Sequence, residues 1–306
     1  MSHNHLLWWQ ALCYGSVLVA TFSCVHISAD QHSADASGRQ QTVLYQVGAD
    51  YPEYSNYSQL EWQQIASRGQ LSVAKIYALL VVQGSEEALT EARRYLAKYP
   101  GNLTGFEALA HVLYAEKKLA LANHYARYVL ARDPERKSMY NVLGLIAVYE
   151  AESLADYREA EALFSRAVES ESVAHVALLN LGFLHLEMGA LARAKASFFR
   201  AKDVCDSCPI SMLGLGITLR RLDEFQEAEK YLRLALKSTM PDRTRYKFYF
   251  HLALVLRNNP QRIQEALKLL AAVINQMDAK EELYIRSQAV LDEIRLNIPK
   301  TLNSSL

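Results

Sequence analysis

The sequence predicts an all-α fold, a right-handed superhelical solenoid of antiparallel helix pairs, on the strength of two observations. One spacing of 34 residues recurs, since it separates Pro100 from Pro134 (134 − 100 = 34) and Gly182 from Gly216 (216 − 182 = 34). Within each period, apolar and small residues follow the three- and four-residue spacing of a helix face. Because a single helix pair cannot bury its own apolar face, such a period is typical of stacked repeats.

A glycine inside an apolar helix points to the contact that joins the two helices of a pair. Gly182 lies within a helical run although glycine costs about 1 kcal/mol relative to alanine in a helix interior. Ala194, Phe198 and Ala201 follow at helical spacing. We therefore expect the second helix to approach the first closely at Gly182.

The full pattern resembles the tetratricopeptide repeat, whose 34 residues carry a large apolar residue, leucine, a small residue, alanine, an aromatic or leucine, alanine and a final proline. The resemblance covers about residues 69–276 and implies five to six repeats, the first of them (69–102) degenerate. The matching residues of the five clear units are Phe106, Leu109, Ala110, Ala122 and Pro134; Tyr140, Leu143, Gly144, Ala160 and Phe164; Leu178, Leu181, Gly182, Ala194 and Phe198; Met212, Leu215, Gly216, Ala228 and Leu232; and Tyr249, Leu252, Ala253, Ala266 and Leu270.

Local signals mark where the helical region, 58–297, begins, varies and ends. Ser85, followed by two glutamates, has the composition of an N-cap. Between Gly144 and Ala160 the spacing is 16 residues (160 − 144 = 16), four more than in the other units, and we expect these four to add about one helical turn. Residues 278–297 predict a capping helix, and 298–306 a polar tail.

The N-terminal 24 residues differ in composition from the rest. Leu6 to Cys24 is apolar and has no ionisable group apart from a tyrosine and cysteines, which is typical of a secretory signal peptide. Its end, Ala20 to Cys24, resembles a bacterial lipobox, and this resemblance implies lipidation of Cys24. An ordinary cleaved signal, an uncleaved membrane anchor and a segment of another kind remain alternatives. Residues 25–57 predict a polar tether.

Composition and motifs argue against several classes of function. The 33 basic and 33 acidic residues balance, so there is no basic field for nucleic acid. The repeats occupy nearly all of 69–297, and the sequence has no phosphate-binding glycine loop and no HExxH. We therefore expect no enzyme activity, no cofactor and no metal site.

Cys205 and Cys208 lie in the turn between the third and fourth units, as Cys-x-x-Cys. In an oxidising compartment we expect a disulfide that staples this turn. A redox-active pair, half of a zinc site and two free thiols are the alternatives.

The resemblance also implies a binding surface, since tetratricopeptide arrays bind peptides or helices on the concave face made by their first helices. An apolar partner helix or extended segment is expected there, with the arginines meeting acidic groups, and Phe183→Ala with Ile217→Ala should then abolish binding without affecting melting. The alternatives are that the chain's own N-terminal segment or a second copy covers this row, and that the arginines are ordinary solvated charge. The row contains Glu107, His111, Tyr114, Asn141, Leu145, Leu179, Phe183, Leu186, Leu213, Ile217, Arg220, Arg221, Phe250, Leu254 and Arg257.

The combination of lipobox and repeats resembles the pilotins, repeat lipoproteins that help type IV pilus secretins assemble. It implies a non-enzymatic protein-interaction scaffold, a periplasm-facing outer-membrane lipoprotein that serves a pilus, secretion or motility machine. A cytoplasmic or membrane-anchored adaptor of another pathway is the alternative.

Overall fold

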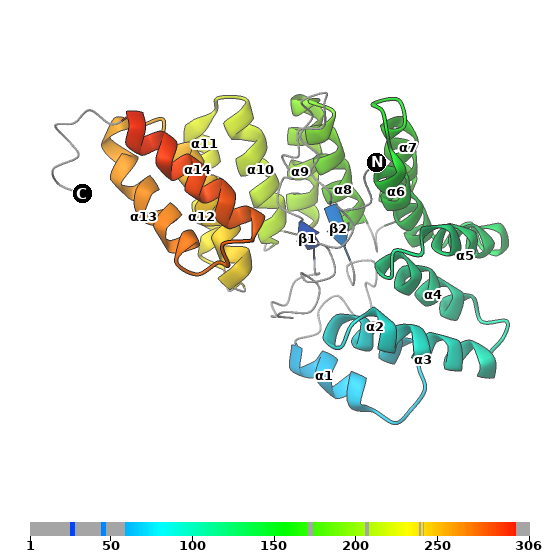
Figure 1. The fold of residues 1–306 in the computed structure, drawn as a ribbon. Helices are drawn as coiled ribbons and strands as arrows, with labels where there is room; N and C mark the ends of the chain where they lie inside the picture. Colours follow the sequence, from blue (N-terminus) through cyan, green and yellow to red (C-terminus); the bar gives the residue numbers. More distant parts are fainter. Residues whose placement is uncertain are drawn as a thin grey trace, which may run out of the picture. The chain divides into compact units, whose positions relative to one another are not determined.

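The computed structural model describes residues 25–27, 44–46, 59–170, 174–205, 208–238, 240 and 242–297. The prediction of an all-α repeat fold is confirmed, because consecutive helices pack against each other in antiparallel pairs (Figure 1). Two strands of three residues, β1 (Val25–Ile27) and β2 (Leu44–Gln46), form a small sheet that the sequence did not predict. The helices are α1 (Gln59–Ser67), α2 (Val73–Val82), α3 (Ser85–Lys98), α4 (Leu103–Ala115), α5 (Leu119–Arg132), α6 (Ser138–Glu150), α7 (Tyr157–Val168), α8 (Ala174–Glu187), α9 (Leu191–Val204), α10 (Pro209–Arg221), α11 (Phe225–Leu236), α12 (Asp242–Leu256), the 3₁₀ helix η2 (Pro260–Arg262), α13 (Ile263–Ile274) and α14 (Glu282–Asn297).

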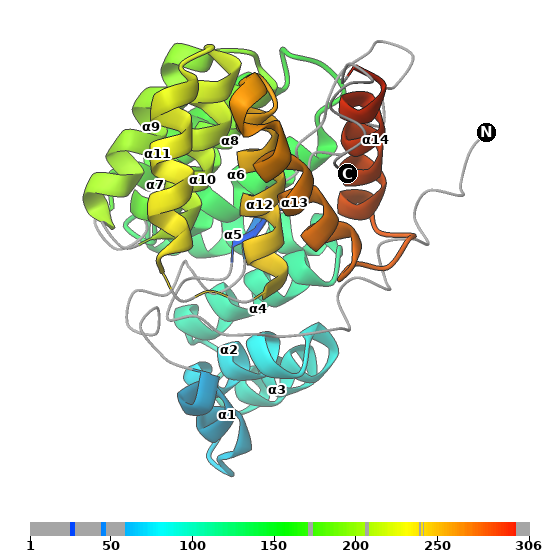
Figure 2. The same ribbon diagram turned by 90° about the vertical axis from the view of Figure 1, so that its left-hand side faces the viewer.

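The helices fall into two compact units, one ending at Asn180 and the other beginning at Leu181. In the first unit, α1 to α7 pack in succession. In the second, α10 to α13 lie side by side in Figures 1 and 2, and α14 packs against α12 and α13. The helix predicted over 278–297 therefore exists but begins at Glu282.

Glycine and aromatic residues meet at the helix joints, as the sequence predicted. A methyl group built on Gly182 of α8 would come within 2.6 Å of the Phe198 ring of α9. A methyl group built on Gly144 of α6 would likewise come within 2.6 Å of the Phe164 ring of α7. Both rings are fully buried. Each glycine therefore occupies a position where a Cβ would exclude the ring that fills the joint.

The tight turn between the helices of a pair has a residue of left-handed conformation at one fixed repeat position. Lys117, Gly189 and Asp223 have φ of 59°, 69° and 59°, and Gly189 and Asp223 are one period apart (223 − 189 = 34). Only glycine adopts this conformation without strain, so the lysine and the aspartate show that the repeat geometry imposes the turn.

Two local predictions were wrong. Ser85 is the first residue of α3 rather than its N-cap; the cap is Gly84, with φ 114° and no side-chain hydrogen bond. The four residues inserted before Ala160 add no helical turn, since α6 ends at Glu150 and α7 begins at Tyr157. Asp156 explains why: its carboxylate accepts hydrogen bonds from the backbone N–H of Glu152 (3.0 Å) and of Ser153 (2.7 Å), which favours a turn over a helix.

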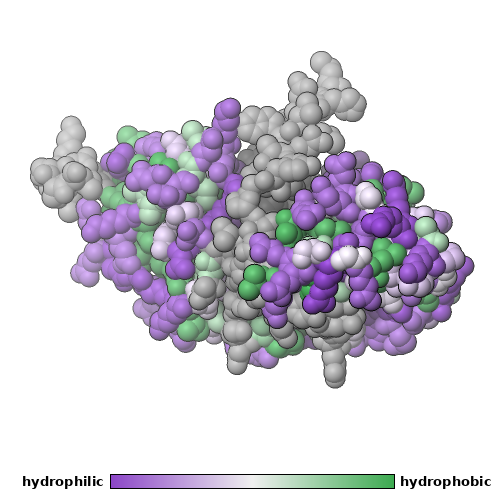
Figure 3. Space-filling model, turned by 90° about the horizontal axis from the view of Figure 1, so that it is seen from below, coloured by the Kyte–Doolittle hydropathy of each residue, from purple (hydrophilic) through white to green (hydrophobic). Residues whose placement is uncertain are grey.

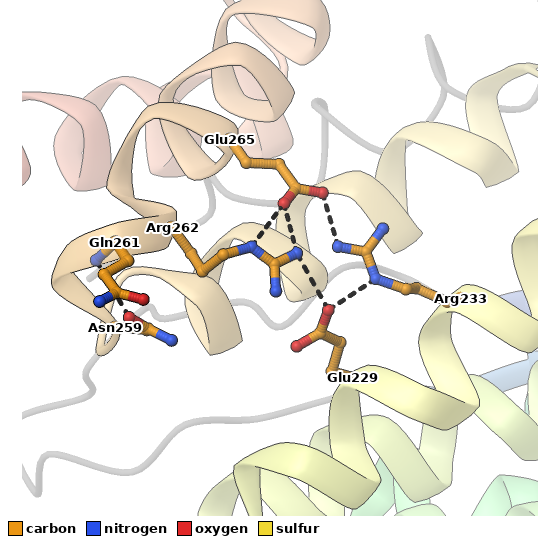
Figure 4. A network of polar contacts seen from close by, with 6 residues as sticks. All are labelled: Glu229, Arg233, Asn259, Gln261, Arg262 and Glu265. Atoms are coloured by element: carbon orange, nitrogen blue, oxygen red, sulfur yellow. Dashed lines mark hydrogen bonds and ion pairs between the residues drawn. The ribbon is translucent and has the colours of Figure 1, made fainter.

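An ion-pair network links the second helices of two neighbouring repeats (Figure 4). Arg233 of α11 donates to Glu229 at 2.6 Å and to Glu265 of α13 at 2.5 Å. Arg262 donates to the same two carboxylates. Burial alone would raise the pKa of Glu265, but the hydrogen bonds from both arginines lower it below its ordinary value. The four side chains are partly exposed, so the network orients α13 on α11 more than it stabilises the fold.

No helix in the described ranges combines the length and apolar character needed to cross a bilayer. The signal peptide or anchor predicted over 1–24, including Cys24, lies outside the described residues, as do most of the tether over 25–57 and the tail over 298–306.

Candidate functional site

The row of residues predicted to face solvent on the first helices, here called the first-helix face, is mostly buried. The expectation of an accessible apolar groove was therefore wrong, and whether these residues contribute to binding stays a prediction. The buried members are His111, Tyr114, Asn141, Leu145 and Leu179 in the first unit and Phe183, Leu186, Leu213, Ile217, Phe250 and Leu254 in the second.

Phe183 shows why a residue of this row is core. Its side chain is 0% exposed. Its ring meets that of Phe198 edge to face, with 4.7 Å between centroids and 78° between planes. Because Phe198 fills the joint at Gly182, Phe183 extends the same buried cluster. The expectation that Phe183 faces a groove was wrong.

Polar side chains are buried on the first helices of the first unit. Asn180 of α8 donates a 2.9 Å hydrogen bond to the Asn141 side chain of α6. Asn141 was predicted from the sequence but Asn180 was not, because the two are 39 residues apart (180 − 141 = 39), one more than the period with its insertion (34 + 4 = 38). His111 is also buried, which lowers its pKa to about 3 and keeps the imidazole neutral at neutral pH.

The arginines of the row, expected to meet acidic groups of a partner, already have partners in their own unit. Arg257 forms a 2.9 Å ion pair with Glu293 of α14. Arg221 donates to the backbone carbonyl of Leu186 at 2.9 Å. This carbonyl is near the C-terminal end of α8, where a positive charge interacts favourably with the helix dipole. Arg220 is half-buried. Arg257 and Arg221 therefore have partners within the chain, and whether they also meet acidic groups of a partner protein stays a prediction.

Glu107, the acidic member of the row, joins two repeats. Its carboxylate accepts hydrogen bonds from Arg136 at 2.7 Å and from the Ser138 hydroxyl. Arg136 also donates to Thr104 at 3.1 Å. Glu107 therefore orients α6 on α4, a role that the sequence period does not reveal.

Cys205 and Cys208 are joined by a disulfide, with 5.5 Å between their Cα atoms. Cys205 is the C-cap of α9 and Cys208 is the N-cap of α10, so the bond closes the turn between the third and fourth units. The Cys208 carbonyl also accepts a 2.8 Å hydrogen bond from Ser211.

Further accessible side chains lie at the edge of the first-helix face, where the first helices end. In the first unit the Lys117 ammonium lies 5.5 Å from the Tyr114 ring centroid and 5.2 Å from that of Tyr149. Tyr149 is 44% exposed, and Lys117 is exposed as well. We call Lys117 and Tyr149 the rim. Their aromatic and cationic groups suit contact with another polypeptide. On the Kyte–Doolittle scale, Figure 3 shows a face where apolar areas alternate with hydrophilic side chains.

Comparisons with solved structures show the fold. The pilF product of Pseudomonas aeruginosa aligns with a TM-score of 0.56 and 22% identity, over 71% of this chain and 95% of its own. PilW, a type IV pilus biogenesis factor, aligns with 0.55 and 19%, over 71% and 94%. A tetratricopeptide repeat protein from Parabacteroides merdae aligns with 0.51 and 16%, over 75% and 85%. The chain thus has the tetratricopeptide fold.

The sequence comparison is narrower. Human cilia- and flagella-associated protein 70 is 29% identical over 128 residues, which is 41% of this chain and 11% of that protein. The chain thus matches about a tenth of the length of this relative. No known family profile matches the chain.

Proposed function

We propose, from the tetratricopeptide fold, that this chain is a non-enzymatic protein-interaction scaffold, tethered to a bacterial envelope and serving the assembly of a pilus, secretion or motility machine. The observation that carries the scaffold function is the rim, where a lysine held between two tyrosines stays accessible above a buried first-helix face. The likeness to the pilF product and to PilW supports the choice of pathway.

The partner in this proposal is a protein that contacts the rim with aromatic and charged groups. The apolar anchors expected from the sequence are buried and offer little accessible surface to a partner helix. Lys117, in the turn after α4, and Tyr149, near the end of α6, are both accessible and lie side by side, so the ammonium group and the ring need no rearrangement to be contacted.

Replacing the rim should remove binding while leaving the fold intact. We expect Lys117→Ala with Tyr149→Ala to reduce partner capture by about tenfold or more, because both contacts of the rim are lost. Both side chains are exposed, so the melting temperature should change little. The measurement is affinity capture with the full-length chain from its source cells, quantified by mass spectrometry.

Leu234→Ala is the matched control, because Leu234 is exposed to a similar extent (42%) but lies on the second helix α11. Capture that is unchanged in the rim variant, or lost equally in the control, would exclude the rim as the binding surface.

Envelope tethering rests on the sequence resemblance to a lipobox. We expect the mature protein to begin at Cys24 and to carry lipid there, in the membrane fraction. Intact-mass spectrometry of the natively produced protein checks this. An unprocessed, unlipidated mass from a soluble fraction would favour the alternative, a cytoplasmic adaptor, and the same mass from membranes would favour an uncleaved anchor.

A further inference from the structure

The repeat that starts at Leu103 places the tyrosine rings of its second helix, α5, outside the core. In the following repeats the core position of the second helix holds Phe164 and Phe198, both fully buried. In this repeat the same position is Ala126, also fully buried, and its neighbours Tyr125 and Tyr128 are only partly buried. The aromatic area that other repeats use for packing is therefore presented at the surface here.

These rings form one organised surface. Phe106 of α4 stacks on Tyr125 (5.6 Å between centroids, 16° between planes) and lies 4.8 Å from Tyr128. The Arg132 guanidinium lies 3.5 Å from the Tyr128 ring centroid and donates to the Tyr128 carbonyl. Leu121, 49% exposed, continues the same helix face at spacings of four, three and four residues to Arg132. We call these five residues the α5 aromatic face.

The charge on α5 has one sign. The helix contains two arginines and no acidic residue. Arg132 has no acidic partner in the described part of the chain, and the ion pair of Arg127 with Glu159 is long, at 4.0 Å. His124, on the same helix, packs edge-on against Tyr125. The face therefore complements a negatively charged ligand.

The helical backbone of α5 excludes a ligand that binds by strand pairing. Within a helix the N–H and C=O groups are paired with each other, so an extended peptide cannot add to α5 as a strand. A polyproline II segment needs no backbone partner, and its proline rings pack on flat aromatic side chains. Partly buried stacked rings beside a guanidinium that has no carboxylate partner match such a segment when it also carries carboxylates.

We propose that the α5 aromatic face binds an acidic, proline-containing peptide segment, with prolines on Phe106, Tyr125 and Tyr128 and a carboxylate on Arg132. The charged end of this surface is distant from the rim, because Lys117 is in the turn where α4 ends, whereas Arg132 is the last residue of α5. The proposal is thus independent of the proposed function, and each can fail alone.

The test measures binding of labelled peptides to the full-length chain by fluorescence anisotropy. Three peptides of equal length alternate Glu with Pro, Lys with Pro, and Glu with Gly. We expect the Glu–Pro peptide to bind about tenfold more tightly than either of the others, and binding to weaken as salt is raised. Equal binding of the Lys–Pro or Glu–Gly peptide, tighter binding of a single-stranded oligonucleotide, or no binding would overturn the proposal.

Two variants locate the binding on this face. Arg132→Glu should weaken Glu–Pro binding by about tenfold or more, and Arg132→Gln by less, which keeps the test valid if charge reversal disturbs the fold. Lys268→Glu makes the same charge change at an exposed residue of α13 and should have no effect. Binding that survives both Arg132 variants, or falls equally in the Lys268 control, would place the peptide elsewhere and overturn the assignment.

Discussion

Phe198→Ala is expected to destabilise the protein by about 3 to 5 kcal/mol, the cost of removing a buried phenylalanine and leaving a cavity. The ring is fully buried and contacts the backbone region of two first helices, at Gly182 of α8 and Gly214 of α10. Neither helix can close the gap without moving the repeat that it belongs to. Urea denaturation of the full-length chain measures the loss.

The same joint predicts an unusual glycine effect. Gly214→Ala should destabilise by about 2 kcal/mol, although alanine is the better helix former, because its Cβ would overlap the Phe198 ring and Gly182 blocks the ring on the other side. Combining Gly214→Ala with Phe198→Leu should cost less than the sum of the two single changes. Gly101→Ala is the control, since a Cβ there meets nothing within 4 Å. Strict additivity at 214 and 198 would refute this packing.

Phe183→Ala is expected to destabilise the protein by about 3 to 5 kcal/mol, because it also removes a buried phenylalanine and leaves a cavity. Its side chain is 0% exposed and packs on Phe198, so the change opens the core of the third repeat. This replaces the sequence-based expectation that the substitution would spare folding. Thermal and urea unfolding followed by circular dichroism provide the measurement.

Leu234→Ala, at an exposed site on α11, serves as the control and should change stability by less than about 0.5 kcal/mol. The double variant Phe183→Ala with Phe198→Ala should lose less stability than the sum of the losses in the two single variants, because the two rings contact each other. A Phe183→Ala variant that unfolds like the wild type would restore the idea that this residue faces a binding groove.

The repeat architecture could be predicted from the sequence because its contacts recur. The joint between Gly182 and Phe198 is made again between Gly144 and Phe164, so the same residue types return at fixed spacing. A small residue and a large one that recur at this spacing therefore predict where the two helices of a repeat pack together. The capping helix could be predicted for a similar reason, since its apolar residues follow a helical period.

Contacts made once along the chain could not be predicted in this way. Glu107 with Arg136 and Arg257 with Glu293 pair residues 29 and 36 apart, and neither pair repeats in the pattern. The spacing of Cys205 and Cys208 is compatible with a disulfide, with free thiols or with a metal site. In the structure the two cysteines form a disulfide. The partly buried rings of Tyr125 and Tyr128 flank Ala126, which departs from the repeat pattern, and the sequence shows this departure without indicating where the rings lie.

The sequence by itself determined the fold class, the repeat length and the residues that join the helices of each pair. Only the tertiary structure decided which side of the first helices is accessible, and it buried Phe183 and Leu213 while leaving Tyr149 exposed. The physical reason is that periodicity specifies which helix faces pack together, whereas the exposure of a single side chain depends on the neighbours that several helices bring to it at once.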